Sequence, residues 1–133
     1  MSENLELVRS IYADWERGDW GSAEWADTDV EFVAADGPWA GGVVGKPAMA
    51  GLWRQYLEAW ENVRARPDDF RDLGGGRVLA LHTWSARGKV SGLTVEQIEA
   101  RSAVLFQVVA GKVSKLVAYQ DRARAFADLG LEE

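Results

Sequence analysis

The chain has 133 residues, which is enough for one compact domain and too few for two ordinary ones, so we expect a single domain over residues 1–133. About 47% of the residues are apolar and 27% are charged, a composition that excludes disordered and low-complexity chains. The net charge of −6 disfavours a nucleic-acid partner, and the absence of cysteine excludes disulfides and thiolate chemistry.

The first predicted element is a helix over residues 3–17. Its apolar residues recur at spacings of three and four, as in Leu5, Val8 and Tyr12, and Gly18 follows as a helix-ending residue. Asp19 is a candidate cap for a short second helix that reaches Trp25.

A strand, a loop and a longer helix are expected next. Residues 29–34 alternate polar and apolar, which indicates a strand, and residues 36–42 are rich in turn formers. Pro47 suits the first turn of a helix over residues 46–62. Three aromatic residues fall on one stripe of this helix: Trp53, Tyr56 and Trp60.

The second half of the chain is predicted to be mainly strands. Pro67 places its segment at a sheet edge or interrupts a strand there. Residues 77–88, 92–109 and 112–119 have the patterns of successive antiparallel strands, and a last short helix follows and ends at Gly130. Helices followed by an antiparallel meander indicate the α+β class.

The last strands are apolar on both faces. In residues 112–119, Val117 and Tyr119 share one face, while Leu116 and Ala118 share the other. Only one face can pack on the helices, so we expect a homodimer through the second face, with Leu116 as a candidate interface residue if its face is the outer one.

No membrane span, signal peptide or cofactor motif is expected. No run of eighteen apolar residues occurs, and charges appear early in the chain, which suggests a cytoplasmic protein. His82 is the only histidine, so a transition-metal site is not expected. Gly74–Gly76 lack the residues of a phosphate-binding loop, so we expect no organic cofactor either.

Short motifs spread along the chain resemble those of a known family. They are NLELVRSIY at 4–12, RGDW at 17–20, DVEF at 29–32, GKP at 45–47, VSG at 90–92, GKV at 111–113 and YQDRARAFADLGL at 119–131. Together they resemble the SnoaL-like branch of the nuclear transport factor 2 (NTF2-like) superfamily, which includes polyketide cyclases and ketosteroid isomerases. The resemblance implies a cone: a curved sheet wrapped around a long N-terminal helix, with a pocket at the open end and dimers through the outer sheet face.

The chain departs from this family at several functional positions. Many relatives have His and Asp where this chain has Val33 and Ala34, and many have His at the position of Val104. The tyrosine of ketosteroid isomerases would fall at Ile11, with Tyr12 one step around the helix. These departures leave two functions open, a catalyst and a binding module.

Asp121 is the first candidate catalytic residue. It matches an aspartate that serves as acid/base in cyclases of the family, and a carboxylate at the rim of an apolar cavity could abstract a proton beside a carbonyl. Alternatively, Asp121 caps the helix that follows it.

His82 is the second candidate. If the face that carries Val78, Ala80, His82 and Trp84 lines the pocket, His82 could move a proton or bind a carbonyl oxygen. The alternative is a half-buried histidine that bonds to a neighbour across the sheet.

Aromatic side chains are the candidates for ligand binding, each with core packing as the alternative. They are Tyr12, Trp15, Trp53, Tyr56, Trp60, Trp84, Phe106 and Tyr119. Asp36 lies in a turn near the expected pocket mouth, and Arg101 belongs to a charged strand face expected to meet solvent.

The sequence thus predicts a protein with a pocket for a small apolar or aromatic ligand. As an enzyme it would be a cofactor-free isomerase or cyclase that performs acid–base chemistry on a cyclic or aromatic carbonyl compound. As a binding module it would keep the pocket without the chemistry.

Overall fold

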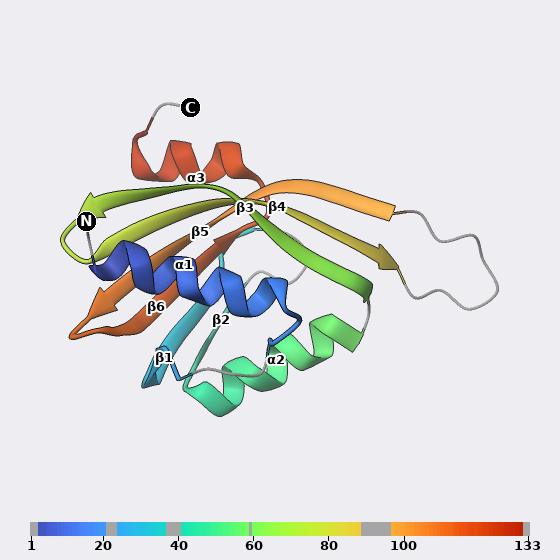
Figure 1. Cartoon of the computed structure of the whole chain (residues 1–133), viewed down its shortest axis with the longest axis horizontal. Helices are drawn as coiled ribbons and strands as arrows, with labels where there is room; N and C mark the ends of the chain where they lie inside the picture. The colour runs from blue at the N-terminus through green and yellow to red at the C-terminus, as the bar shows by residue number, and fades with distance from the viewer. Residues whose placement is uncertain (1–2, 21–23, 37–40, 59, 89–96, 132–133) are drawn as a thin grey trace.

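The computed structural model describes residues 3–20, 24–36, 41–58, 60–88 and 97–131. Within these ranges, six strands form one mixed sheet and three helices lie against it. Helices α1 (Glu3–Glu16) and α2 (Lys46–Glu58) lie on the inner side of the sheet, and α3 (Arg122–Leu129) lies on the other side (Figure 1). The α+β class and the cone expected from the resemblance are confirmed.

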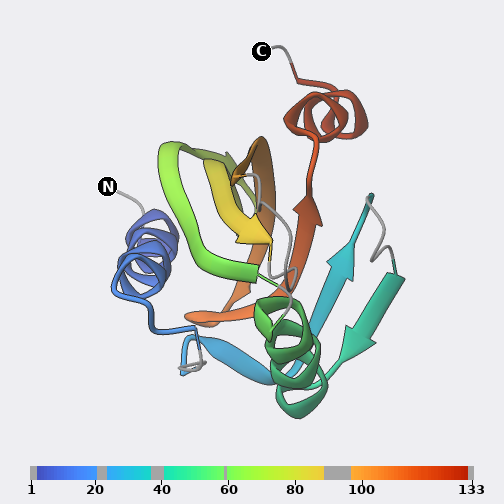
Figure 2. The same ribbon diagram turned by 90° about the vertical axis from the view of Figure 1, so that its right-hand side faces the viewer.

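The sheet is curved and remains open (Figure 2). Its strand order is β2-β1-β6-β5-β4-β3, and β1 pairs with β6 in parallel while the other neighbours are antiparallel. The strands are β1 (Ala26–Ala34), β2 (Gly41–Val44), β3 (Trp60–Gly74), β4 (Arg77–Gly88), β5 (Gln97–Val109) and β6 (Lys112–Tyr119). The strand with Pro67 lies at the sheet edge, as predicted, because proline cannot donate to a second neighbour.

The main core lies between α1 and the inner face of the sheet. The apolar stripe of α1 is buried there, with Val8, Ile11 and Tyr12 at most 1% exposed. Tyr12 contacts the rings of Trp15 and Phe106 edge-on. Because this helix fills the inner face at one end of the sheet, the remaining space lies toward α2.

A second apolar cluster lies on the outer face beneath α3. It includes Leu79, Leu81 and Tyr119 from the sheet and Phe126 from the helix. Alternate residues of β4 therefore face opposite sides, and the face with Val78, Ala80, His82 and Trp84, whose direction the sequence left open, is the inner one.

Several predicted element boundaries were wrong. Helix α2 ends at Glu58, so Trp60 belongs to strand β3 and not to the stripe of Trp53. Gly41 and Gly42, expected at the end of a loop, instead begin strand β2 (Gly41–Val44), because β1 supplies its hydrogen-bond partners.

The short helix expected between Asp19 and Trp25 is not present at its described residues, where Trp25 lies in a turn. Residues 21–23 of that helix, and residues 92–96 of the predicted long strand, lie outside the described part of the chain.

Candidate pocket in the cone

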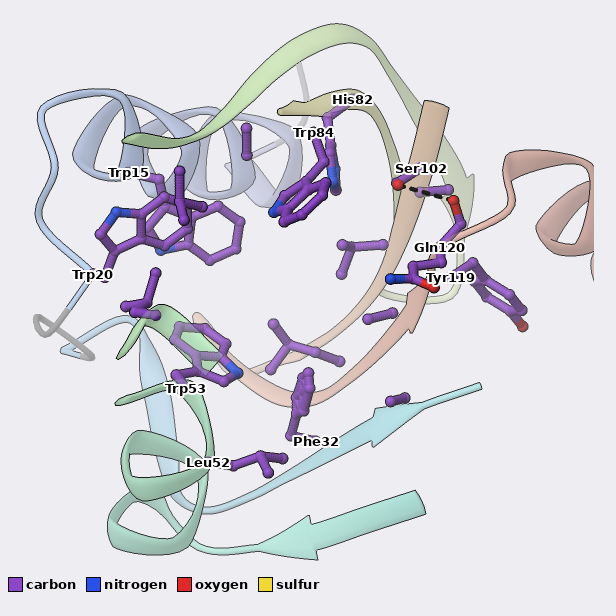
Figure 3. Close-up of a pocket in the computed structure, with 18 of the residues that line it drawn as sticks. Trp15, Trp20, Phe32, Leu52, Trp53, His82, Trp84, Ser102, Tyr119 and Gln120 are labelled. Atoms are coloured by element: carbon purple, nitrogen blue, oxygen red, sulfur yellow. Dashed lines mark hydrogen bonds between the residues drawn. The ribbon is translucent and has the colours of Figure 1, made fainter. Parts of the chain in front are cut away.

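The open end of the cone holds a cavity of about 200 Å³. It lies between α2 and the inner face of the sheet, beyond the C-terminal end of α1 (Figure 3). Its lining residues are Trp15, Trp20, Phe32, Ala34, Asp36, Leu52, Trp53, Leu57, Val63, Ala65, His82, Trp84, Ser102, Ala103, Val104, Leu116, Ala118, Tyr119 and Gln120. The lining is mostly apolar, and its few polar groups lie on β4 and β5, at the end of β6 and just after β1.

One end of the cavity is walled by indole rings. Trp20 stacks on Trp15 at 5.4 Å between ring centroids, and Trp53 meets Trp15 edge-on at 5.6 Å. Phe32 closes this side against Trp53 at 5.7 Å. The buried Nε1 of Trp15 has no hydrogen-bond partner in the described part of the chain, so ring packing rather than hydrogen bonding fixes this side chain.

The polar end of the cavity is formed by residues from neighbouring strands. His82 on β4 and Ser102 on β5 are register partners, and both line the cavity. The Ser102 hydroxyl donates to the carbonyl of Gln120 at 2.9 Å, and the Gln120 side chain projects toward the cavity (Figure 3). An occupant would therefore meet rings at one end and hydrogen-bonding groups at the other.

A buried hydrogen bond joins His82 to helix α1. Tyr12 Oη lies 2.7 Å from His82 Nδ1, and the two side chains are 1% and 7% exposed as residues. Burial raises the pKa of Tyr12 well above its ordinary value, so the phenol stays neutral. Burial, and to a smaller extent the charge of Arg122, lowers the pKa of His82 to about 4 against an opposing effect of Asp68.

These protonation states determine what His82 presents to the cavity. A neutral phenol is a better donor than a neutral imidazole, so we assign the shared hydrogen to Tyr12 and the ring hydrogen of His82 to Nε2. Nε2 has no partner among the described residues, and the ring lines the cavity. The site therefore offers a neutral N–H donor in apolar surroundings.

Asp36 lies at the rim of the cavity and ties the first strand to the last. Its Oδ1 accepts from the backbone N–H of Gln120 at 2.6 Å, and its Oδ2 accepts from that of Asp121 at 3.1 Å. The sequence indicated a turn here, and the structure adds the contact across 85 residues. Asp36 is the one carboxylate among the described lining residues.

Asp121 lies outside the cavity lining. It is exposed, and its Oδ1 accepts from the backbone N–H of Ala123 at 3.0 Å as the N-cap of α3. The structure thus has the capping arrangement that the sequence left open, and it directs the carboxylate at the helix rather than at the pocket.

Of the eight aromatic candidates, Trp15, Trp53 and Trp84 line the cavity with their side chains at the inner face. Tyr12 and Phe106 are buried in the core, although Tyr12 reaches the site through His82.

Trp60 and Tyr119 have other surroundings. Trp60 contacts Trp84 edge-on at 5.4 Å and is not among the described lining residues. Tyr119 borders the cavity, but its ring turns away toward α3, where the nearby Asp128 adds to the effect of burial in raising its pKa (Figure 3). The side chain of Tyr56 lies outside the described part of the structure.

Sequence reasoning missed several lining residues, notably Trp20, Phe32, Ser102 and Gln120. The alternation of the long strand places Ser102 and Val104 on one face. Because Ser102 pairs with His82 on the neighbouring strand, this alternation indicated that both residues lie on the face of His82. Trp20 follows the first helix in a segment without periodicity, so nothing local indicated its direction.

Neither a metal cluster nor a membrane-spanning helix is found where the structure describes the chain. No group of three or more His, Cys, Asp or Glu side chains there is arranged to hold a metal ion, and His82 is hydrogen-bonded to a phenol rather than to a carboxylate. None of the described helices is long and apolar enough to cross a membrane.

An open α+β cone with an apolar cavity and a few inward polar groups defines a class of small pocket proteins. The chain belongs to the SnoaL-like domain family, whose model matches residues 8–116. No protein of curated function matches the sequence.

Solved structures with the same fold cover nearly the whole chain. An NTF2-like protein from Burkholderia pseudomallei is 23% identical with a TM-score of 0.78, covering 96% of this chain and 97% of that one. A proposed polyketide cyclase from Xanthomonas campestris is 20% identical with a TM-score of 0.72, covering 94% and 95%. TerC, co-crystallised with polyporic acid, is 22% identical with a TM-score of 0.73, covering 96% and 98%.

Proposed function

We propose that the pocket binds an uncharged molecule of one or two rings that carries a carbonyl oxygen. The observation that carries this proposal is the buried His82 imidazole, which lines a cavity walled by indoles and has Nδ1 occupied by Tyr12, so that Nε2 is left for a ligand. A carbonyl oxygen would accept from Nε2, and the ring of the ligand would lie among Trp15, Trp20 and Trp53.

The size of the cavity supports a small ring compound. An apolar protein cavity of roughly 150 Å³ is enough for benzene. The cavity here is about 200 Å³ and is open at its rim, so a bicyclic molecule fits the same reasoning. The resemblance in fold to a proposed polyketide cyclase and to TerC, crystallised with polyporic acid, agrees with an organic ligand of this kind.

The charges around the cavity favour an uncharged ligand. The described lining residues include the carboxylate of Asp36 and no lysine or arginine. His82 contributes no positive charge near neutral pH, because its pKa is about 4. An anionic ligand would lose its hydration without gaining a cationic partner.

Calorimetric titration with three related compounds tests this proposal. We expect 1-tetralone to bind more tightly than tetralin, which lacks the acceptor, by about fivefold for one net hydrogen bond. The anion 1-naphthoate should bind most weakly. His82→Phe should remove the preference for tetralone over tetralin, while Asp121→Asn, outside the pocket, should keep it. Equal affinities for all three compounds in the unmodified protein would contradict the proposal.

A second function, proton transfer on the bound carbonyl compound, is favoured by one further observation. Asp36 and His82 line the same cavity, so a ligand could meet a carboxylate and an N–H donor together. We propose that the Asp36 carboxylate takes a proton from the carbon beside the carbonyl. The electron pair of that C–H bond then forms a C=C bond, and the resulting enolate oxygen accepts from His82 Nε2. Return of the proton to another carbon would complete an isomerisation.

Deuterium exchange separates this catalyst from a binding module. In D₂O, the protein should accelerate exchange at the carbon beside the carbonyl of 1-tetralone, as followed by NMR. Both Asp36→Asn and His82→Phe should remove the acceleration, whereas Asp121→Asn should not. Binding without any acceleration would identify the protein as a binding module.

A further inference from the structure

A buried arginine lies against the back of the polar end of the pocket. Arg122 is the first residue of α3, on the outer side of the sheet, and is only 7% exposed. Its Nη2 donates to the carbonyl oxygen of His82 at 2.9 Å, and its Nε donates to that of Ser102 at 3.3 Å. One guanidinium therefore binds the backbone of both members of the His82–Ser102 pair.

The charge of Arg122 is balanced by one carboxylate. Asp68 Oδ2 lies 2.6 Å from Arg122 Nη2 and also accepts from the Thr83 hydroxyl at 2.8 Å. Asp68 sits where the register of β3 shifts between Pro67 and Asp69, so the irregular strand turns this side chain toward the arginine. Although burial alone would raise it, the pKa of Asp68 is lowered by its hydrogen bonds from Arg122 and Thr83.

We propose that Arg122 is a positioning residue that holds the backbone of the His82–Ser102 pair from the outer face of the sheet and places a positive charge behind His82. The inference rests on the proposed function only for its consequence in ligand binding. Its two parts, the bonds to the carbonyls and the nearby positive charge, act on groups that line the pocket, while Arg122 itself has no place in the lining.

Few groups can control the charge of His82, which makes the role of Arg122 measurable. The groups that face the ring or its backbone are Tyr12 from α1, Asp68 from β3 and Arg122 from α3. Tyr12 is neutral, so Arg122 and Asp68 supply the charges and act in opposite directions: the arginine disfavours an imidazolium and the aspartate favours it.

Titration of His82 by NMR tests this role without any ligand, and His82 is the only histidine in the chain. In Arg122→Met the midpoint should rise from about 4, because the repelling charge is gone while Asp68 remains. The matched control is Arg124→Met on the same helix, since Arg124 is exposed and pairs with Asp128. An identical midpoint in both variants would overturn the proposal.

A second variant should shift the His82 midpoint in the opposite direction, and it keeps the test decisive if Arg122→Met fails to fold. Asp68→Asn retains acceptors for Arg122 and Thr83 but removes the negative charge. The His82 midpoint should then fall below that of the unmodified protein, an outcome that a merely structural role would not produce. A raised or unchanged midpoint would overturn the charge part of the proposal.

Arg122→Lys separates charge from geometry. Lysine keeps the positive charge but not the planar group that binds several acceptors at once. We expect a His82 midpoint near that of the unmodified protein together with at least threefold weaker binding of 1-tetralone at pH 7. Unchanged affinity would overturn the positioning part. If the unmodified protein does not bind 1-tetralone at all, the proposed function fails, while the ligand-free titrations still decide the role of Arg122.

Discussion

At the scale of single residues, the chemistry of the pocket depends on how His82 is buried. The ring is enclosed between the core around Tyr12 and the cavity, and its Nδ1 is occupied by the phenol. Desolvation then lowers the pKa to about 4, which makes the side chain a neutral hydrogen-bond donor at physiological pH. A histidine at ordinary exposure would titrate near 6.5 and would be partly charged there.

This shift predicts a specific pH dependence of stability. Between the ordinary pKa of 6.5 and the folded value of about 4, the unfolded chain binds a proton that the folded protein does not. The contribution of His82 to the free energy of unfolding is therefore fully present above pH 6.5. It is lost as the pH falls toward 4, by about 3 kcal/mol at most. Urea unfolding at pH 7 and pH 4.5 measures it.

The control for this pH dependence is His82→Gln, which can still accept from Tyr12 but does not titrate. Its unfolding free energy should change less over the same window. Asp68 affects a separate, lower window, because its lowered pKa lies below the ordinary 3.8. If the unfolding free energy falls equally steeply with pH in His82→Gln and in the unmodified protein between pH 6.5 and pH 4.5, the buried, neutral imidazole is contradicted.

Removal of one hydroxyl tests the bond between Tyr12 and His82. Tyr12→Phe leaves the ring packing in place but deprives the buried Nδ1 of its partner, which should cost about 1–3 kcal/mol in the free energy of unfolding. Tyr119→Phe is a matched control, because its hydroxyl lies near Asp128 on the outer side. Urea unfolding should show the larger loss for Tyr12→Phe, and a loss no larger than that of the control would count against the buried bond.

The contact between Tyr12 and His82 illustrates where residue-level prediction reached its limit. Alternation along β4 correctly placed His82 on the same face as Trp84, and the helical stripe correctly buried Tyr12. The two residues are 70 positions apart, however, and their contact depends on how α1 crosses the sheet. No local pattern contains that crossing, so the partner of His82 could not be predicted.

At the scale of elements, periodicity predicted the long helix and the central strands but not the short or interrupted pieces. The helix over residues 3–17 and the strand over 77–88 match α1 and β4 because each buries one regular face. Strand β2 has four residues and gains its hydrogen bonds from β1, so its sequence of Gly and Val carried no signal of its own. The aromatic stripe of Trp53 and Trp60 was misleading because the chain changes from helix to strand between them.

The N-terminus of α3 gives a prediction about an element rather than about the pocket. Asp121→Ala removes the side-chain acceptor for the Ala123 amide and should cost about 1 kcal/mol in the free energy of unfolding. Asp121→Asn supplies a nearly equivalent cap and should change stability little. Both variants should retain the affinity for 1-tetralone, as measured by calorimetry. Loss of binding in Asp121→Asn with unchanged stability would instead restore a functional role for this carboxylate.

At the scale of the whole molecule, helices cover the two faces of the sheet to different extents. The inner face is filled by α1, α2 and the cavity, whereas α3 covers only part of the outer face. The sequence left open which face carries Leu116, and the structure places it inside, 1% exposed and lining the cavity. Leu116 is therefore not an outer-face residue. Leu105 and Val117, which are paired across β5 and β6 and half-buried, belong to the outer face instead.

We predict that two copies associate through this outer face, because the contact would bury the apolar residues beside α3. Val117→Glu would place a charge in that contact and should convert a dimer into a monomer, as sedimentation at micromolar concentration would show. Ala13→Glu is the control, because Ala13 is exposed on α1, which lies on the inner side of the sheet. It should leave the dimer intact. A monomeric unmodified protein at that concentration, or dissociation by both substitutions alike, would contradict an interface at the outer face.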